Sequence, residues 1–154
     1  MNERPSYIPW PPILLVAAVV AAMLLARFYP LSWPGSNDTA AQAVGLSIGI
    51  GGIVLMAWSV WTLRRAKTTV LPNQAADALV TTGPYKRFRN PIYIADVMLL
   101  LGMAELTKNI WFVIGAAIFV VLVTWLAILP EERHLEARFG DEYTDYKQKS
   151  RRWL

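Results

Sequence analysis

The stretch GPYKRFRNPIY, residues 83–93, places polar, basic and aromatic side chains between two strongly apolar segments. A second polar cluster, Pro130-Glu131-Glu132, follows the next two apolar segments. Charged side chains beside or within a bilayer are costly and usually mark functional sites. Two such clusters at the two ends of one apolar hairpin therefore predict a site, and we expect chemistry at a membrane surface.

The composition indicates an integral membrane protein. The chain has 154 residues, enough for one domain, and it is 55% hydrophobic and 17% charged, whereas soluble domains carry about 25% charged residues. The lack of cysteine excludes disulfides and thiolate chemistry, and with His134 as the single histidine we expect no metal site. The net charge is +4, but the basic residues lie beside apolar runs, so we expect membrane lipids rather than nucleic acid as partners.

The apolar segments predict an all-α fold with four transmembrane helices in a single membrane domain. The expected spans are residues 12–28, 41–63, 91–106 and 110–129. The turn at residues 107–109 makes the last two spans a helical hairpin. Residues 64–90 form a long polar loop, and residues 130–154 form an amphipathic tail that lies on the bilayer or folds against this loop. We expect Gly140 to end one tail helix and Asp141 to cap the next.

The lysines and arginines predict the orientation of the chain. Thirteen of the fifteen lie in the N-terminus, the long loop or the tail, and the other two are Arg27 and Lys108. The positive-inside rule then places both termini and both polar clusters in the cytoplasm. The short, minimal architecture favours a bacterial inner-membrane protein.

The second expected span carries three glycines at helical spacing, Gly45, Gly49 and Gly52. Glycines spaced in this way allow close approach of another helix. Packing within one monomer is favoured over an oligomer that forms through these glycines.

The hairpin brings residues that are distant in sequence to one place. Because only a short turn joins the two helices, Asn90 and Tyr93 should lie close to Glu131 and Glu132 at its open end. Asp96, farther into the third span, faces the substrate or pairs with an arginine at the end of the second span, Arg64 or Arg65. His134 lies one turn beyond Glu131 and is a further candidate, although a position outside the site is favoured for it.

The order and spacing of several motifs resemble the isoprenylcysteine carboxyl methyltransferases and the related phospholipid methyltransferases. The motifs are TGPY at 82–85, RNPIY at 89–93, EE at 131–132, and FGDEY at 139–143 followed by Tyr146. The similarity covers residues 68–153, a little over half of the chain. Each motif alone is weak, and their order makes the resemblance specific.

This resemblance implies S-adenosylmethionine as the methyl donor, bound at the cytoplasmic face. The cofactor-contacting residues that it implies are Asp77, Ala78, Leu79, Val80, Tyr85, Asn90, Pro91, Tyr93 and Glu131. It implies a catalytic role for Arg89, Asn90 and Tyr93.

These assignments agree with the chemistry of the cofactor. Glu131 can pair with its ammonium group, and Arg87 or Arg89 can hold its carboxylate. Tyr85 and Tyr93 offer ring faces for adenine or the sulfonium. For Glu132, in contrast, a solvated charge near a helix start is favoured.

Two departures from the family pattern bear on the acceptor. Asn90 stands where the eukaryotic pattern has histidine, and an amide cannot relay a proton, so transfer to a neutral amine or hydroxyl needs a base from elsewhere. Ala127 stands where the prenylcysteine enzymes place a substrate-binding arginine, which argues against a prenylcysteine carboxylate as substrate.

The function that this sequence favours is methyl transfer to a lipophilic acceptor that enters sideways from the bilayer. A small isoprenoid acid, a phospholipid amine and a hydrophobic thiol remain open as acceptors. The alternatives are a membrane reductase of the related sterol-reductase type, which would bind a nicotinamide dinucleotide, and a membrane protein without catalytic activity.

Overall fold

The computed structural model describes residues 8–35, 38–68, 70 and 78–154, and these residues form helices and no strands, which confirms the predicted all-α fold. The elements are α1 (Trp10–Phe28), α2 (Thr39–Arg65), the 3₁₀ helix η1 (Gly83–Lys86), α3 (Pro91–Thr107), α4 (Ile110–Val123), the π-helical turn η2 (Thr124–Ile128), α5 (Leu129–Phe139) and α6 (Asp141–Lys149).

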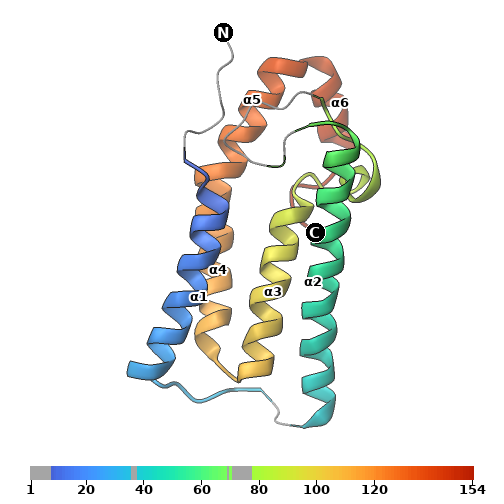
Figure 1. Cartoon of the computed structure of the whole chain (residues 1–154). Coiled ribbons are helices and arrows are strands. Elements are labelled where there is room, and N and C mark those ends of the chain that lie inside the picture. The colour runs from blue at the N-terminus through green and yellow to red at the C-terminus, as the bar shows by residue number, and fades with distance from the viewer. Residues whose placement is uncertain (1–7, 36–37, 69, 71–77) are drawn as a thin grey trace.

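The long helices stand side by side, with the short ones gathered at one end (Figure 1). α3 packs between α2 and α4, and α1 packs on α4. α5 continues the line of α4 beyond the bundle, and α6 folds back from it toward the start of α3 (Figure 1). The polar loop and tail therefore meet at the end of the bundle where α2 stops and α3 begins.

Among the described residues, three helices are long and apolar enough to cross a membrane. They are α1, α2 and the continuous 30-residue helix Ile110–Phe139 made of α4, η2 and α5. The prediction of four spans is not confirmed, because α3 has only 17 residues. A helix of that length rises about 26 Å, which is less than the hydrocarbon thickness of about 30 Å. Neighbouring helices instead bury much of its surface.

The contact between α2 and α3 uses the glycines that the sequence singled out. Gly45 lies against Glu105, and Gly52 lies against the Ala95 carbonyl. Gly49 faces Gly102, and a Cβ atom added to Gly102 would come within 2.8 Å of the Gly49 Cα atom. These glycines therefore let two helices of the same chain approach closely.

We expect Gly102→Ala to destabilise the protein by about 1–3 kcal/mol, since the new methyl group meets backbone atoms that cannot move aside. Gly115→Ala in α4 is the matched control, because its Cβ would lie 3.7 Å from Ala18, an ordinary van der Waals contact. Thermal unfolding in detergent measures both variants. Equal unfolding temperatures would contradict the close α2–α3 approach.

The last predicted span, residues 110–129, lies within a longer helix. The helix continues through Pro130 to Phe139. Proline lacks an N–H group, and its ring collides with the carbonyl one turn earlier in a regular α-helix. The wider turn η2 lies immediately before Pro130, and the Leu129 N–H group donates to the Thr124 carbonyl, five residues back. A local π turn of this kind accommodates the proline without ending the helix.

The tail folds against the polar loop, which was one of its two expected placements. Gly140, with a φ angle of +53°, ends α5 as predicted. The expected cap by Asp141 is wrong, because Gly140 occupies the N-cap position of α6 and no side chain caps that helix. Beyond α6, the Arg89 N–H group donates to the Arg151 carbonyl over 2.7 Å, and the Arg151 N–H group donates to the Arg87 carbonyl over 2.9 Å.

Candidate active site

A cavity of about 350 Å³ lies where the loop and the tail meet the bundle. Its volume falls within the range of about 300–1,000 Å³ that is typical of small-molecule sites. The long helices α1 and α2 contribute an apolar wall, made of Pro11, Pro12, Leu15, Met56, Val60 and Leu63. The start of α3, η1, α5 and α6 contribute the polar wall.

The structure gathers the predicted site residues around this cavity. The lining includes Ala78, Leu79, Val80, Tyr85, Arg89, Asn90, Pro91, Tyr93 and Glu131. They come from three separate segments: the loop with η1, the first turn of α3 and the first turn of α5. Asp77, the remaining predicted residue, lies outside the described residues. The roles of these residues in binding and catalysis stay predictions, taken up below.

Glu131 and Tyr93 join the two ends of the predicted hairpin. The Tyr93 hydroxyl donates to Glu131 Oε2 over 3.3 Å, from the first turn of α3 to the first turn of α5. Glu131 is half-buried and lines the cavity. Within the described part of the chain, no basic side chain forms an ion pair with it, so its carboxylate is available to a cationic ligand.

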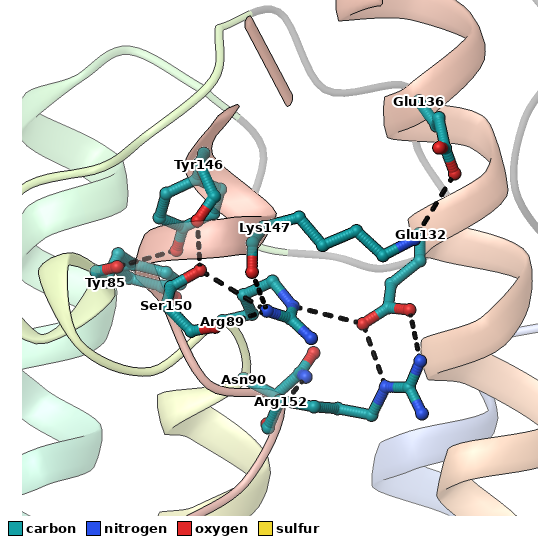
Figure 2. A network of polar contacts seen from close by, with 9 residues as sticks. All are labelled: Tyr85, Arg89, Asn90, Glu132, Glu136, Tyr146, Lys147, Ser150 and Arg152. Carbon is teal, nitrogen blue, oxygen red and sulfur yellow. Dashed lines mark hydrogen bonds and ion pairs between the residues drawn. The ribbon is translucent and has the colours of Figure 1, made fainter. Parts of the chain in front are cut away.

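The prediction of a solvated Glu132 is wrong. Glu132 is only 6% exposed, and its carboxylate forms ion pairs with Arg89 over 3.2 Å and with Arg152 over 2.7 Å (Figure 2). Adjacent residues on a helix point about 100° apart. Glu131 therefore reaches Tyr93, while Glu132 reaches the arginines of the loop and tail.

Arg89 links the loop to the tail. Its Nη1 atom donates to the Ser150 carbonyl over 2.6 Å and to the Lys147 carbonyl over 3.0 Å, and its Nε atom donates to Glu132 (Figure 2). These bonds fix the guanidinium beside the cavity. Arg89 therefore positions the tail in this structure, in addition to lining the cavity.

Asn90 holds the end of the tail in a similar way. Its Nδ2 atom donates to the Arg152 carbonyl over 3.0 Å, and the residue is buried at the N-cap position of α3 (Figure 2). Tyr146 makes a third hydrogen bond between the tail and the loop, since its hydroxyl donates to the Tyr85 carbonyl over 2.6 Å. Three elements that are far apart in sequence thus close one side of the cavity.

The position of Asp96 does not support one of its two expected roles, the ion pair with Arg64 or Arg65. Asp96 lines the cavity and is only 4% exposed, and among the described residues no ion pair joins it to Arg64 or Arg65. His134 also lines the cavity, although a position outside the site was favoured for it.

The tyrosines of the loop and tail are neutral phenols at physiological pH. Burial raises the pKa of Tyr85 well above its usual range, and the nearby charge of Glu131 raises it further. Burial raises the pKa of Tyr146 to about 12, although hydrogen bonding with Ser150 and the charge of Arg89 oppose this shift. Tyr85 can donate a hydrogen bond to a ligand, whereas the Tyr146 hydroxyl already donates to the Tyr85 carbonyl, and neither phenol serves as a base. The bidentate bond with Glu132 raises the pKa of Arg152, so that arginine stays charged.

Sequence reasoning missed two parts of the site. The apolar wall from α1 and α2 has no motif, because one apolar residue in a membrane helix looks like any other. Tyr143 lines the cavity and is 1% exposed, and its hydroxyl has no hydrogen-bond partner in the described part of the chain. Its spacing of three residues from Tyr146, which is also in the lining, was the available signal.

Comparison with known proteins places the chain in a family. A model of the phospholipid methyltransferase family matches residues 40–142. An uncharacterised protein of Haemophilus influenzae is 40% identical over 63 residues, which are 41% of this chain and all of that protein. No solved structure matches the chain.

Two longer relatives carry names from metal resistance. The nickel-cobalt-cadmium resistance protein NccN of Alcaligenes xylosoxydans xylosoxydans is 28% identical over 137 residues, which are 86% of this chain and 59% of that protein. The cobalt-zinc-cadmium resistance protein CzcN of Cupriavidus metallidurans is 25% identical over 138 residues, which are 89% of this chain and 58% of that protein. The chain thus spans somewhat less than three fifths of the length of these two proteins.

The family match covers the second long apolar helix, the loop, the hairpin and the start of α6, which are the segments that supply most of the cavity lining. Three apolar helices in the described part of the chain are long enough to span a membrane, as an integral membrane protein requires. The chain therefore belongs to the phospholipid methyltransferase family of integral membrane methyltransferases.

Proposed function

We propose that this protein transfers a methyl group from S-adenosylmethionine to a lipophilic acceptor at the cytoplasmic face of a bacterial inner membrane. The observation that carries the proposal is one cavity with a polar wall from η1, α3, α5 and α6 and an apolar wall from α1 and α2. Such a cavity can hold a polar methyl donor and a lipophilic methyl acceptor together.

The polar wall suits the donor. S-adenosylmethionine supplies an electrophilic methyl group on a sulfonium when it is bound. Glu131, which faces the cavity without a basic partner among the described residues, would hold its ammonium group. Tyr93 keeps that carboxylate oriented, and Tyr85 offers an aromatic face. The backbone of residues 78–80 is within the lining and can receive the adenine edge.

The apolar wall suits an acceptor that arrives from the bilayer. Leu15 on α1 and Met56, Val60 and Leu63 on α2 line the cavity between helices that are exposed over much of their length. A lipid chain lying between these helices would leave its head group beside Tyr93. The protein then accelerates transfer mainly by holding the nucleophile in line with the methyl group and excluding water.

Among the open acceptors, a phospholipid amine fits the cavity best. Both acidic side chains that face it without an ion pair among the described residues, Asp96 and Glu131, repel an acid and attract an ammonium group. Ala127, buried in η2, provides no cation for a carboxylate. The family name, phospholipid methyltransferase, agrees with this choice.

The direct test is incubation of membranes that contain the protein with methyl-labelled S-adenosylmethionine. We expect label in a lipid that carried a primary or secondary amine, identified by mass spectrometry, and no label with membranes that lack the protein. Label in no lipid, or tight binding of a nicotinamide dinucleotide in a parallel titration, would contradict the proposal and favour the alternatives.

Two tyrosines of the site give a comparative prediction. Tyr93→Phe removes the hydrogen bond that orients Glu131 and should lower methyl transfer by about 10- to 100-fold, as expected for a bond to a charged group. Tyr143→Phe removes a hydroxyl without a partner among the described residues, so it should change activity less and leave stability equal or higher. Initial rates and thermal unfolding measure the pair, and the reverse order of activities would misplace the reacting centre.

A further inference from the structure

Asp96 is a buried acid within an apolar helix. It lies three residues beyond Tyr93 on α3, which is about 4.5 Å deeper along the helix axis. Its exposed fraction is 4%, yet it lines the cavity. A buried carboxylate without hydrogen bonds costs free energy and is rarely retained without a purpose.

The other buried or half-buried acids at the two ends of the bundle have partners, whereas Asp96 has none in the described part of the chain. Glu105, on the same helix, pairs with Lys108. Glu132 pairs with two arginines, and Glu131 accepts a hydrogen bond from Tyr93. For Asp96 the described residues provide neither an ion pair nor a hydrogen bond, so its carboxylate remains available to a ligand in the cavity.

The charged and titratable groups that share the cavity with Asp96 lie on the polar side. On its own helix there is Tyr93. From α5 come Glu131, Glu132 and His134, from the loop Tyr85 and Arg89, and from α6 Tyr143 and Tyr146. The helices α1 and α2 add only apolar side chains to the lining. Asp96 is thus the acid on the α3 side of the cavity, next to the wall where a lipid would lie.

We propose that Asp96 is the catalytic base of this enzyme: it pairs with the ammonium group of the lipid acceptor and accepts its proton. This inference rests on the proposed function. Asn90 cannot accept a proton, and Glu131 is the partner assigned to the donor. An ammonium group must become a neutral amine before its nitrogen has an electron pair to share.

The step balances within the cavity. One proton passes from the ammonium group to the Asp96 carboxylate, and the freed electron pair of nitrogen forms the bond to the methyl carbon. The carbon–sulfur bond breaks, and its electron pair stays on sulfur. The methylated amine is again cationic, and the protonated Asp96 returns its proton to water once the product leaves.

The first experiment compares Asp96→Asn with Glu105→Gln, a substitution on the same helix away from the cavity. We expect Asp96→Asn to lower methyl transfer to an ethanolamine phospholipid about 100-fold, within the usual contribution of a general base. Its affinity for S-adenosylmethionine should stay within about twofold of wild type, and Glu105→Gln should keep the wild-type rate. A wild-type rate for Asp96→Asn would overturn the proposal.

The pH profile separates a base from a residue that only maintains the shape of the cavity. Wild type takes the amine as the ammonium form, so its rate should stop rising with pH once the Asp96 carboxyl is ionised. The Asp96→Asn variant can use only the fraction of lipid that is already a neutral amine in solution. Its rate should therefore rise about tenfold per pH unit below the pKa of an alkyl ammonium, which is about 10. Parallel pH profiles for the two proteins would contradict the role of a base.

A binding experiment keeps this inference distinct from the proposed function. Dodecylamine and dodecanol are titrated into the protein in nanodiscs, without S-adenosylmethionine. Dodecylamine should bind at least about tenfold more weakly to Asp96→Asn than to wild type, as expected for loss of a buried charge pair, and dodecanol should bind equally to both. Equal dodecylamine affinities would overturn the assignment of Asp96. If wild type transfers no methyl group, the proposed function fails, and this titration still decides whether Asp96 binds an amine.

Discussion

Replacing Glu131 with glutamine is expected to weaken binding of S-adenosylmethionine by at least about 100-fold, because loss of one partner of a buried charge pair costs about 3–5 kcal/mol. The same change should leave the protein folded and raise its unfolding temperature slightly. In the described residues the Glu131 carboxylate has one hydrogen bond, from Tyr93, and no ion pair, so an uncompensated charge disappears with the substitution. Glu131→Ala should abolish binding in the same way.

Isothermal titration calorimetry measures the affinity, and thermal unfolding checks the fold. Glu136→Gln is the matched control, because Glu136 lies on the same helix and pairs with Lys147 at the surface. An affinity of Glu131→Gln equal to that of wild type would remove Glu131 from the cofactor site. Loss of binding together with loss of the folded state would instead assign Glu131 to structure.

Replacing Glu132 with alanine is expected to destabilise the protein by about 3–5 kcal/mol, since the substitution leaves Arg89 without its ionic partner in the interior. The side chains of Glu132 and Arg89 are 8% and 10% exposed, so solvent cannot replace the lost carboxylate. Arg152, which is more exposed, should lose its place as well, and with it the bond from Asn90 to the Arg152 carbonyl. The end of the tail should then detach from the loop.

Glu136→Ala again provides the control. Glu136 and Lys147 form an exposed pair over 3.5 Å, and such pairs contribute about 0–1 kcal/mol. Chemical unfolding in detergent measures the free energies, and limited proteolysis reports release of the residues after Lys149. A loss for Glu132→Ala as small as that for Glu136→Ala would mean that the buried network does not hold the tail.

Glu131 and Glu132 show which features of the site local sequence predicts and which depend on the tertiary structure. The hairpin was predictable, because two apolar segments joined by a three-residue turn must return their ends to one side of the bundle. It was therefore predictable that Asn90, Tyr93 and Glu131 would meet, and they do line one cavity. The spacing of turn and apolar residues along the chain is sufficient to predict that these three residues meet.

The environment of Glu132 was not predictable in the same way. Its partners, Arg89 and Arg152, lie 43 residues before it and 20 residues after it. A charged residue that follows a membrane helix looks solvated until a tail folds over it, and the fold of that tail depends on contacts with the loop. The sequence contains the arginines, but their distance from Glu132 is a property of the assembled bundle.

The same division explains the remaining differences. Apolar runs and turn residues are local signals, and they sufficed for the all-α class, for most of the helical segments and for the meeting of Asn90, Tyr93 and Glu131 at one cavity. The passage of the last helix through Pro130, the apolar wall from α1 and α2 and the position of Asp96 in the cavity depend on which helices lie next to one another. Packing decides them, because a membrane helix is apolar on every side and its sequence does not state which side meets a neighbour.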